Sequence, residues 1–187
     1  MRLSSAPRLA FAAALLVPLL SGHALAATVG QPAPAFELKD TSGKTVKLAD
    51  YKGKHVVLEW VNPGCPFVVK HYGSKNMQGL QKEFTAKQVV WLAINSTREG
   101  HYEYYPPQKM AGWMKQVGGA PSATLLDPTG KVGRAYQART TPHMYIVDAK
   151  GSLVYAGGID SIPTARVDDI PKATNFVRQA LAELGLD

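Results

Sequence analysis

The sequence contains one cysteine, Cys65, among its 187 residues. A single cysteine excludes an internal disulfide and therefore a small scaffold stapled by disulfides. It also excludes a zinc site built from several cysteines, and with it the zinc-finger mode of DNA binding. Any chemistry at sulfur must use this one thiol, together with groups from elsewhere in the chain or from another molecule.

Long basic runs are also missing. The 21 lysines and arginines exceed the 14 acidic residues and give a formal net charge of +7. The lysines are scattered along the chain and do not alternate with aromatic residues. Excess positive charge alone is weak evidence for nucleic-acid binding, so no nucleic-acid partner is expected. The 45% hydrophobic and 19% charged composition is typical of one globular domain.

The N-terminal segment has no acidic residue before Glu37. Arg2 and Arg8 precede an apolar stretch over residues 9–20, which is too short for an ordinary membrane span. Ala24-Leu25-Ala26 then has the small-x-small pattern of a cleavage site. We therefore expect a signal peptide over residues 1–26, with an uncleaved anchor as the alternative. The domain over 27–187 is expected to be exported, periplasmic or secreted, without stable membrane insertion after cleavage.

The rest of the chain alternates between strand and helix patterns. Continuous apolar runs predict buried strands, and shorter pairs around Gly-containing turns predict hairpins. Strands are expected over 36–38, 45–48, 55–61, 89–94, 122–126, 143–147 and 153–156. Helices are expected over 66–87, 108–117, part of 127–137, and 171–184. A break near Gly73 and Gly79 is the alternative for the first of them. This order predicts one α/β domain with a mixed sheet and helices on both faces.

Cys65 lies between the strand that ends at Val61 and the helix that begins at Pro66. Proline suits the first position of a helix, where its missing N–H group is not needed. A thiol at this place faces free backbone N–H groups and the positive end of the helix dipole, both of which stabilise a thiolate. We therefore interpret Cys65 as a reactive thiol, with a buried structural cysteine as the alternative.

Two further features stand out in the apolar strands. Glu59 places a carboxylate in a strand that otherwise looks buried, where it could exchange protons with Cys65 through water. The alternatives are that this strand face reaches solvent or that Glu59 pairs with a lysine. Thr141-Pro142 precedes a late strand, and a cis bond there would present the Thr141 backbone as a docking edge for an extended peptide. From local sequence alone, an ordinary trans proline is the alternative.

These features together resemble the thioredoxin superfamily. The segment WVNPGCPFV over residues 60–68 resembles its active-site turn. More closely, NPGCPFVVKHY over 62–72 resembles exported peroxiredoxin-like redoxins of the alkyl hydroperoxide reductase and thiol-specific antioxidant group. Segments 90–96, 125–127, 140–148 and 153–160 continue the similarity, which covers nearly all of residues 28–185.

The resemblance implies a thioredoxin-like fold with an N-terminal β-hairpin extension. It matches Cys65 to the attacking cysteine of a C-x-x-C pair, Glu59 to the buried acid, and Pro142 to a cis-proline beside the thiol. Val68 stands where the second cysteine would be, so an external thiol must resolve a mixed disulfide on Cys65. The peroxiredoxin motif Pro-x-x-x-Thr-x-x-Cys is not matched either, because Leu58 and Asn62 stand at its Pro and Thr positions.

The leading hypothesis is an exported redox protein that uses one nucleophilic cysteine for thiol-disulfide exchange or antioxidant chemistry and needs no cofactor. Its catalytic site would comprise Cys65, Glu59, Pro66, Thr141 and Pro142. Its partners would be protein or small-molecule disulfides and an external thiol reductant.

Three alternatives remain open: a weak thiol peroxidase, a copper-binding chaperone and a non-catalytic binding module. Copper would use Cys65, His71 and His143, because a soft thiolate with imidazoles suits that metal. His71 taken alone is expected at the surface of its helix. His101 is expected to pack within its loop or to form part of a lid.

Overall fold

The computed structural model describes residues 26–187, so the predicted signal peptide lies almost wholly outside the described residues. The strands of the structure are β1 (Glu37–Asp40), β2 (Thr45–Lys47), β3 (Val56–Trp60), β4 (Val90–Asn95), β5 (Ala123–Leu126), β6 (His143–Val147) and β7 (Leu153–Gly157). They form a single sheet in the order β2-β1-β5-β4-β3-β6-β7. The seven strands confirm the predicted mixed sheet with an N-terminal hairpin.

The centre of the sheet is parallel and its margins are antiparallel. Strand β3 pairs in parallel with β4, and β4 with β5, whereas β6 runs antiparallel to both β3 and β7. The β1–β2 hairpin adds to the other side through an antiparallel β1–β5 pair. The carboxyl ends of β3, β4 and β5 therefore meet at one edge of the sheet, and Cys65 follows the end of β3.

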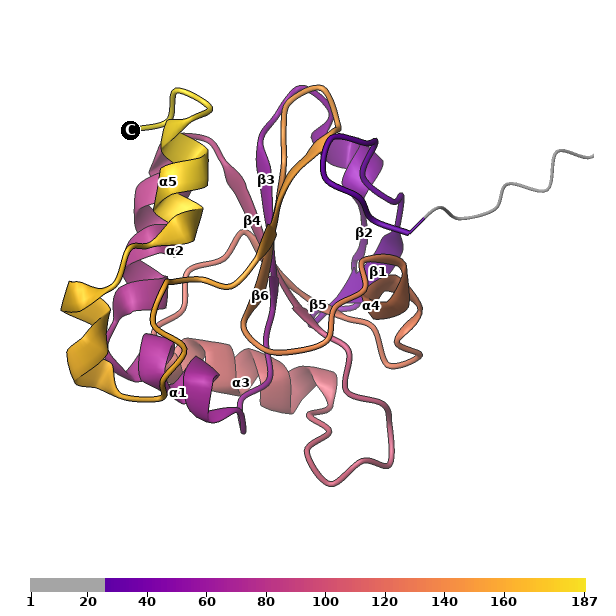
Figure 1. The fold of residues 1–187 in the computed structure, drawn as a ribbon. Coiled ribbons are helices and arrows are strands. Elements are labelled where there is room, and N and C mark those ends of the chain that lie inside the picture. The colour runs from indigo at the N-terminus through magenta and orange to yellow at the C-terminus, as the bar shows by residue number, and fades with distance from the viewer. Residues whose placement is uncertain (1–25) are drawn as a thin grey trace, which may run out of the picture.

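The helices cover both faces of the sheet, as predicted (Figure 1). They are α1 (Pro66–Gly73), α2 (Asn76–Ala86), α3 (Pro107–Val117), α4 (Lys131–Ala135) and α5 (Phe176–Ala182), with 3-10 helices η1 (Leu48–Tyr51) and η2 (Val167–Lys172). One buried cluster includes Tyr72, Leu80, Met110 and Leu181, contributed by α1, α2, α3 and α5. A second buried cluster, on the other face, includes Val132 of α4.

Two predicted helices are interrupted. The helix expected over 66–87 is divided into α1 and α2, because Lys75 adopts a left-handed φ of 65° that cannot continue an α-helix. The predicted start of the C-terminal helix, at residue 171, is wrong. There Pro171 belongs to η2, and Asn175 begins α5 by accepting a hydrogen bond from the Arg178 N–H.

No helix in the described part of the chain is long and apolar enough to cross a membrane.

Candidate active site around Cys65

Cys65 occupies the N-cap of α1, directly after a turn that closes the end of β3. In this turn the Cys65 N–H donates to the Asn62 carbonyl at 3.1 Å, and the Gly64 N–H donates to Asn62 Oδ1 at 3.0 Å. Pro66 takes the first helical position, as the sequence predicts. Cys65 is half-buried.

A cis peptide bond joins Thr141 to Pro142, opposite the thiol. The Cys65 Sγ lies 2.9 Å from the Thr141 carbonyl oxygen, to which the thiol donates. The trans alternative is therefore wrong, and the cis form that the resemblance implies is present. The sequence-predicted residues Cys65, Pro66, Thr141 and Pro142 meet at this point of the structure.

Glu59 lies beneath this surface and has no exposed area. Tyr72 Oη donates to Glu59 Oε1 at 2.7 Å, while Trp91 Nε1 and Gln81 Nε2 donate to Oε2 at 2.8 and 3.0 Å. Burial raises the pKa of the Glu59 carboxyl, although these donors act in the opposite direction. The burial of Glu59 excludes a solvent-facing strand, and its three donors leave it without a lysine partner.

The residue at the second-cysteine position is part of the core. Val68 is fully buried and belongs to the cluster that α1 shares with α2, α3 and α5. Because it lies three residues after Cys65 in α1, it is one helical turn from the N-cap. An apolar side chain therefore fills the place from which a second thiol would approach Cys65.

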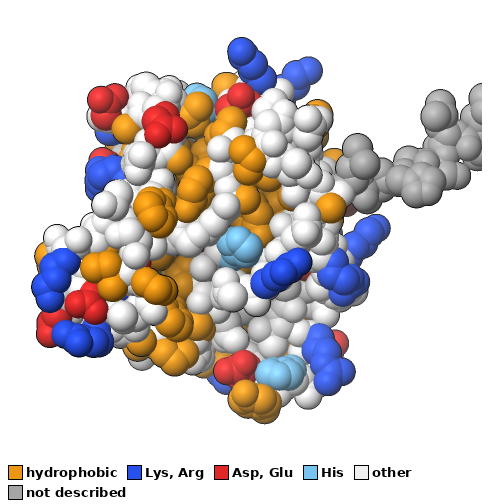
Figure 2. All heavy atoms as spheres, in the orientation of Figure 1, with side chains coloured by type: hydrophobic (Ala, Val, Ile, Leu, Met, Phe, Trp, Pro, Cys, Tyr) orange, Lys and Arg blue, Asp and Glu red, His pale blue; other side chains and the backbone are white. Residues whose placement is uncertain are grey.

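A cavity of about 240 Å³ extends from the cis-proline along α1. Its walls include Phe67, His71, Thr141, Pro142, Ile159 and Ile162. Phe67 and Val69 are also exposed at the start of α1. In Figure 2, hydrophobic side chains gather over the region where Figure 1 places α1. A partly apolar groove therefore borders the cis Thr141–Pro142 bond, whose Thr141 carbonyl contacts the thiol.

Beneath this groove is a buried charged cluster that the sequence did not reveal. Lys70 Nζ lies 3.2 Å from Asp160 Oδ2, and the Lys70 side chain has no exposed area. The same Lys70 ammonium donates to the Ile162 carbonyl at 3.3 Å. These contacts connect α1 to the segment after β7 that forms the opposite wall of the groove.

His71 joins the same cluster, so the prediction that it lies at the helix surface is wrong. Asn76 Nδ2 donates to its Nδ1 at 2.9 Å, and its Nε2 lies 3.6 Å from Asp160 Oδ2. Burial lowers the pKa of His71 to about 4, although the Asp160 carboxylate raises it and Lys70 lowers it further. The imidazole is therefore neutral near pH 7.

The pH dependence of stability should carry the signature of this histidine. The pKa of His71 is about 4 in the folded protein and 6.5 ordinarily, so the unfolded chain takes up a proton on His71 at a higher pH than the folded protein does. The contribution of the neutral imidazole to the free energy of unfolding is therefore complete above pH 6.5 and falls as the pH drops toward 4. We expect urea denaturation to show a shallower loss of unfolding free energy over this range in His71→Gln than in the wild type. Equal slopes for the two proteins would contradict the buried, neutral state of His71.

No group of three His, Cys, Asp or Glu side chains that could hold a metal occurs within residues 26–187. His71 is engaged by Asn76 and Asp160, and His143 Nδ1 lies 3.1 Å from Tyr145 Oη. The structure therefore gives the copper alternative no three-ligand centre in its described part.

The loop between β4 and α3 contributes a carboxylate to the active-site turn that sequence reasoning missed. Glu103 Oε2 accepts a hydrogen bond from Asn62 Nδ2 at 3.1 Å. Its other oxygen lies 2.7 Å from the position that a Cβ atom on Gly64 would take, so glycine permits this close approach. His101 packs in this loop with its ring 4.4 Å from that of Tyr102, in agreement with the packing role expected for it.

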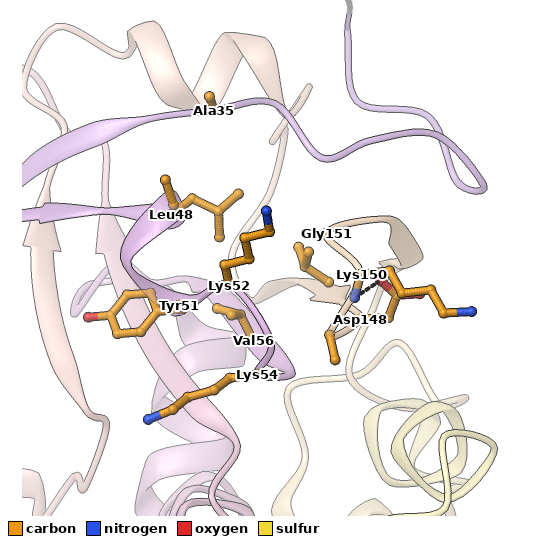
Figure 3. A pocket seen from close by; sticks show the side chains of 12 residues that line it. Ala35, Leu48, Tyr51, Lys52, Lys54, Val56, Asp148, Lys150 and Gly151 are labelled. Atoms are coloured by element: carbon orange, nitrogen blue, oxygen red, sulfur yellow. Dashed lines mark hydrogen bonds between the residues drawn. The ribbon is translucent and has the colours of Figure 1, made fainter.

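Another cavity of about 240 Å³ lies at the opposite end of the sheet (Figure 3). Val56, which begins β3, and Val147, which ends β6, contribute to its wall. Lys52 extends across this hollow, whereas Lys54 and Lys150 point away from it. No predicted site residue lines it, so it is separate from the Cys65 site.

Comparison with known proteins places this geometry in a family. The model of the AhpC/TSA family matches residues 29–156, more than half of the chain. The chain is 29% identical over 127 residues to the thiol-disulfide oxidoreductase ResA of Bacillus subtilis (strain 168), covering 67% of this chain and 64% of ResA. It is 54% identical over 41 residues to the peroxiredoxin Bcp of the same organism, covering 20% of this chain and 26% of Bcp. The matched segments thus span less than two thirds of either relative.

Among solved structures, a Chlorobium tepidum protein assigned as the thiol:disulfide interchange protein DsbE superposes with a TM-score of 0.63. The two sequences are 21% identical, and the match covers 87% of this chain and all of that chain. Together with the strand order, this likeness establishes a thioredoxin-like fold. The chain belongs to the AhpC/TSA family of redoxins.

Proposed function

We propose that this protein is an exported thiol-disulfide exchange protein with Cys65 as its single nucleophile. The observation that carries the proposal is the position of the thiol at the start of α1, beside the cis Thr141–Pro142 bond, whose two residues also line a groove along α1. Similarity to ResA supports exchange chemistry, and the features of residues 1–26 support export.

In the proposed reaction, the Cys65 thiolate attacks one sulfur of a disulfide. A new bond forms between Cys65 and that sulfur, the original S–S bond breaks, and the second sulfur leaves as a thiolate. An external thiolate then attacks the sulfur bound to Cys65, forming a new disulfide with it and releasing the Cys65 thiolate. The external step is required because Val68 provides no sulfur to complete the reaction within the chain.

The other residues receive distinct roles in this proposal. Thr141 and Pro142 present backbone beside the thiol, against which an extended substrate can lie. Pro66 fixes the start of α1 and so the place of Cys65. The buried Glu59 carboxylate accepts a proton as the Cys65 thiol reacts, and three hydrogen-bond donors set its orientation.

Thiol peroxidase activity is a second candidate, favoured by the family match and the local similarity to Bcp. The side chains that a peroxiredoxin uses ahead of its cysteine are absent, because Leu58 and Asn62 replace them. Turnover of hydrogen peroxide with a recycling thiol, compared with turnover of a disulfide, separates the two functions.

A direct test follows adduct formation on the intact protein. The wild type mixed with a small disulfide should gain the mass of one thiol, and added dithiothreitol should remove it. Cys65→Ser should gain nothing, since the chain contains no other thiol. A wild type that remains unmodified while free cysteine reacts would contradict the proposal.

A further inference from the structure

A polar cavity of about 430 Å³ lies beside the active-site turn and has no role in the function described so far. Its lining includes Arg98, His101, Glu103, Thr129, Gly130 and Arg134. These residues come from the segments that follow β4 and β5, where the parallel strands end (Figure 1). In open α/β sheets, ligands commonly bind outside the carboxyl ends of the strands.

The cavity shares a wall with the turn that carries Cys65. Glu103 lines the cavity, and its carboxylate also accepts the Asn62 hydrogen bond and lies against Gly64. Gly64 immediately precedes Cys65 in the chain. A molecule in this cavity therefore lies one layer of side chains away from the reactive turn.

Two arginines, Arg98 and Arg134, line the cavity. Arg134 is held in place, because its Nη1 donates to the Thr129 carbonyl at 3.0 Å and lies 3.0 Å from the position of a Cβ on Gly130. Among residues 26–187, neither Arg98 nor Arg134 forms an ion pair with an aspartate or glutamate. Glu103 is the acidic residue of the lining, and Asn62 already donates to its carboxylate.

We propose that this cavity binds the carboxylates of a small anionic thiol or its disulfide, which exchanges with Cys65. Guanidinium groups bind carboxylates through paired charge-assisted hydrogen bonds. The volume falls within the range of small-molecule sites, about 300–1,000 Å³. The inference rests on the proposed function and identifies the class of the external thiol.

The chemistry is two successive exchanges. The Cys65 thiolate attacks the small disulfide R–S–S–R, forming Cys65–S–S–R and releasing R–S⁻. A second R–S⁻ attacks the sulfur of R in the adduct, which regenerates R–S–S–R and the Cys65 thiolate. When the first adduct is with a protein substrate instead, R–S⁻ attacks the substrate sulfur, the bond from that sulfur to Cys65 breaks, and the protein leaves as a protein–S–S–R disulfide while the Cys65 thiolate is restored.

The test compares three small disulfides on the full chain: anionic glutathione disulfide, neutral bis(2-hydroxyethyl) disulfide and cationic cystamine. Adduct formation is followed by quenching and intact mass, and each rate is divided by that of N-acetylcysteine with the same disulfide. We expect the wild type to prefer the anionic over the neutral disulfide by about tenfold, which corresponds to about 1.4 kcal/mol.

Substitution should locate this preference. Arg98→Gln/Arg134→Gln should bring the ratio close to one, and Arg98→Glu/Arg134→Glu should favour cystamine. Arg166→Gln is the matched control, because Arg166 is exposed and does not line the cavity. It should leave the preference unchanged. Circular dichroism verifies that each variant is folded.

A binding measurement removes the redox step. Cys65→Ser should bind S-methylglutathione in calorimetry, more weakly at high salt, and should lose this binding when Arg98 and Arg134 are also replaced by Gln. Equal normalised rates for the neutral and anionic disulfides, or a preference that survives both arginine substitutions, would overturn the anion site. Failure of Cys65 to react with any disulfide would instead overturn the proposed function.

Discussion

A Val68→Cys variant is expected to convert this single-thiol protein into a self-resolving dithiol. Position 68 lies one helical turn from Cys65 at the start of α1, so a second thiol there can attack a mixed disulfide on Cys65. Intramolecular steps of this kind reach effective concentrations on the order of 10⁵ M in well-oriented cases. The variant should reduce insulin with dithiothreitol as recycling reductant, whereas the wild type should do so slowly.

The burial of Val68 makes this prediction more demanding. A thiol at that position would be enclosed by the core, and its proton must be accepted by a nearby group when it attacks. Glu59, proposed above as the proton acceptor for Cys65, would serve the second thiol as well. Adding Glu59→Gln to Val68→Cys should therefore slow insulin reduction, which needs both thiols, more than adduct formation, which needs Cys65 alone. Such a split separates proton transfer from a general loss of structure.

Two controls accompany the dithiol variant. Cys65→Ser/Val68→Cys should be inactive, because the attacking thiol is absent. Val68→Ala measures the effect of a smaller side chain at this position without adding sulfur. If Val68→Cys folds but forms no internal disulfide under mild oxidation, the thioredoxin-type relation between positions 65 and 68 is wrong.

The central part of the fold could be predicted from the sequence because its signals are local. The apolar strands, the turn at Asn62–Gly64 and the start of α1 at Pro66 each depend on residues adjacent in the chain. The cis bond before Pro142 was different, because local sequence favoured the trans form and only the family resemblance implied cis. Similarity in sequence here supplied tertiary information that a propensity argument does not contain.

The surroundings of the site could not be predicted in this way. The donors to Glu59 come from α1, α2 and β4, and no spacing pattern in the sequence predicts that these side chains meet. The sequence predicts His71 at the surface because a lone polar helical residue usually lies there, but the segment after β7 covers it. The Asp160 carboxylate that approaches the imidazole belongs to a segment remote from His71 in the sequence.

The largest expected effect on stability comes from removing Asp160. Its Oδ2 lies 3.2 Å from the Lys70 ammonium, and both side chains are nearly inaccessible to solvent. Asp160→Ala would leave the Lys70 charge buried without its carboxylate. We expect this loss to lower the free energy of unfolding by about 4 kcal/mol. Urea denaturation near neutral pH should show this decrease in the free energy of unfolding.

A variant in which both partners are replaced distinguishes the loss of the ion pair from the loss of packing. Replacing both partners in Lys70→Met/Asp160→Leu should recover part of the stability lost in Asp160→Ala, because no buried charge then remains at that contact. The exposed pair between Arg178 and Glu83 supplies the control, since Glu83→Ala should cost about 1 kcal/mol or less. If Asp160→Ala destabilises no more than Glu83→Ala, the charged cluster beneath the groove does not hold α1 against the segment after β7.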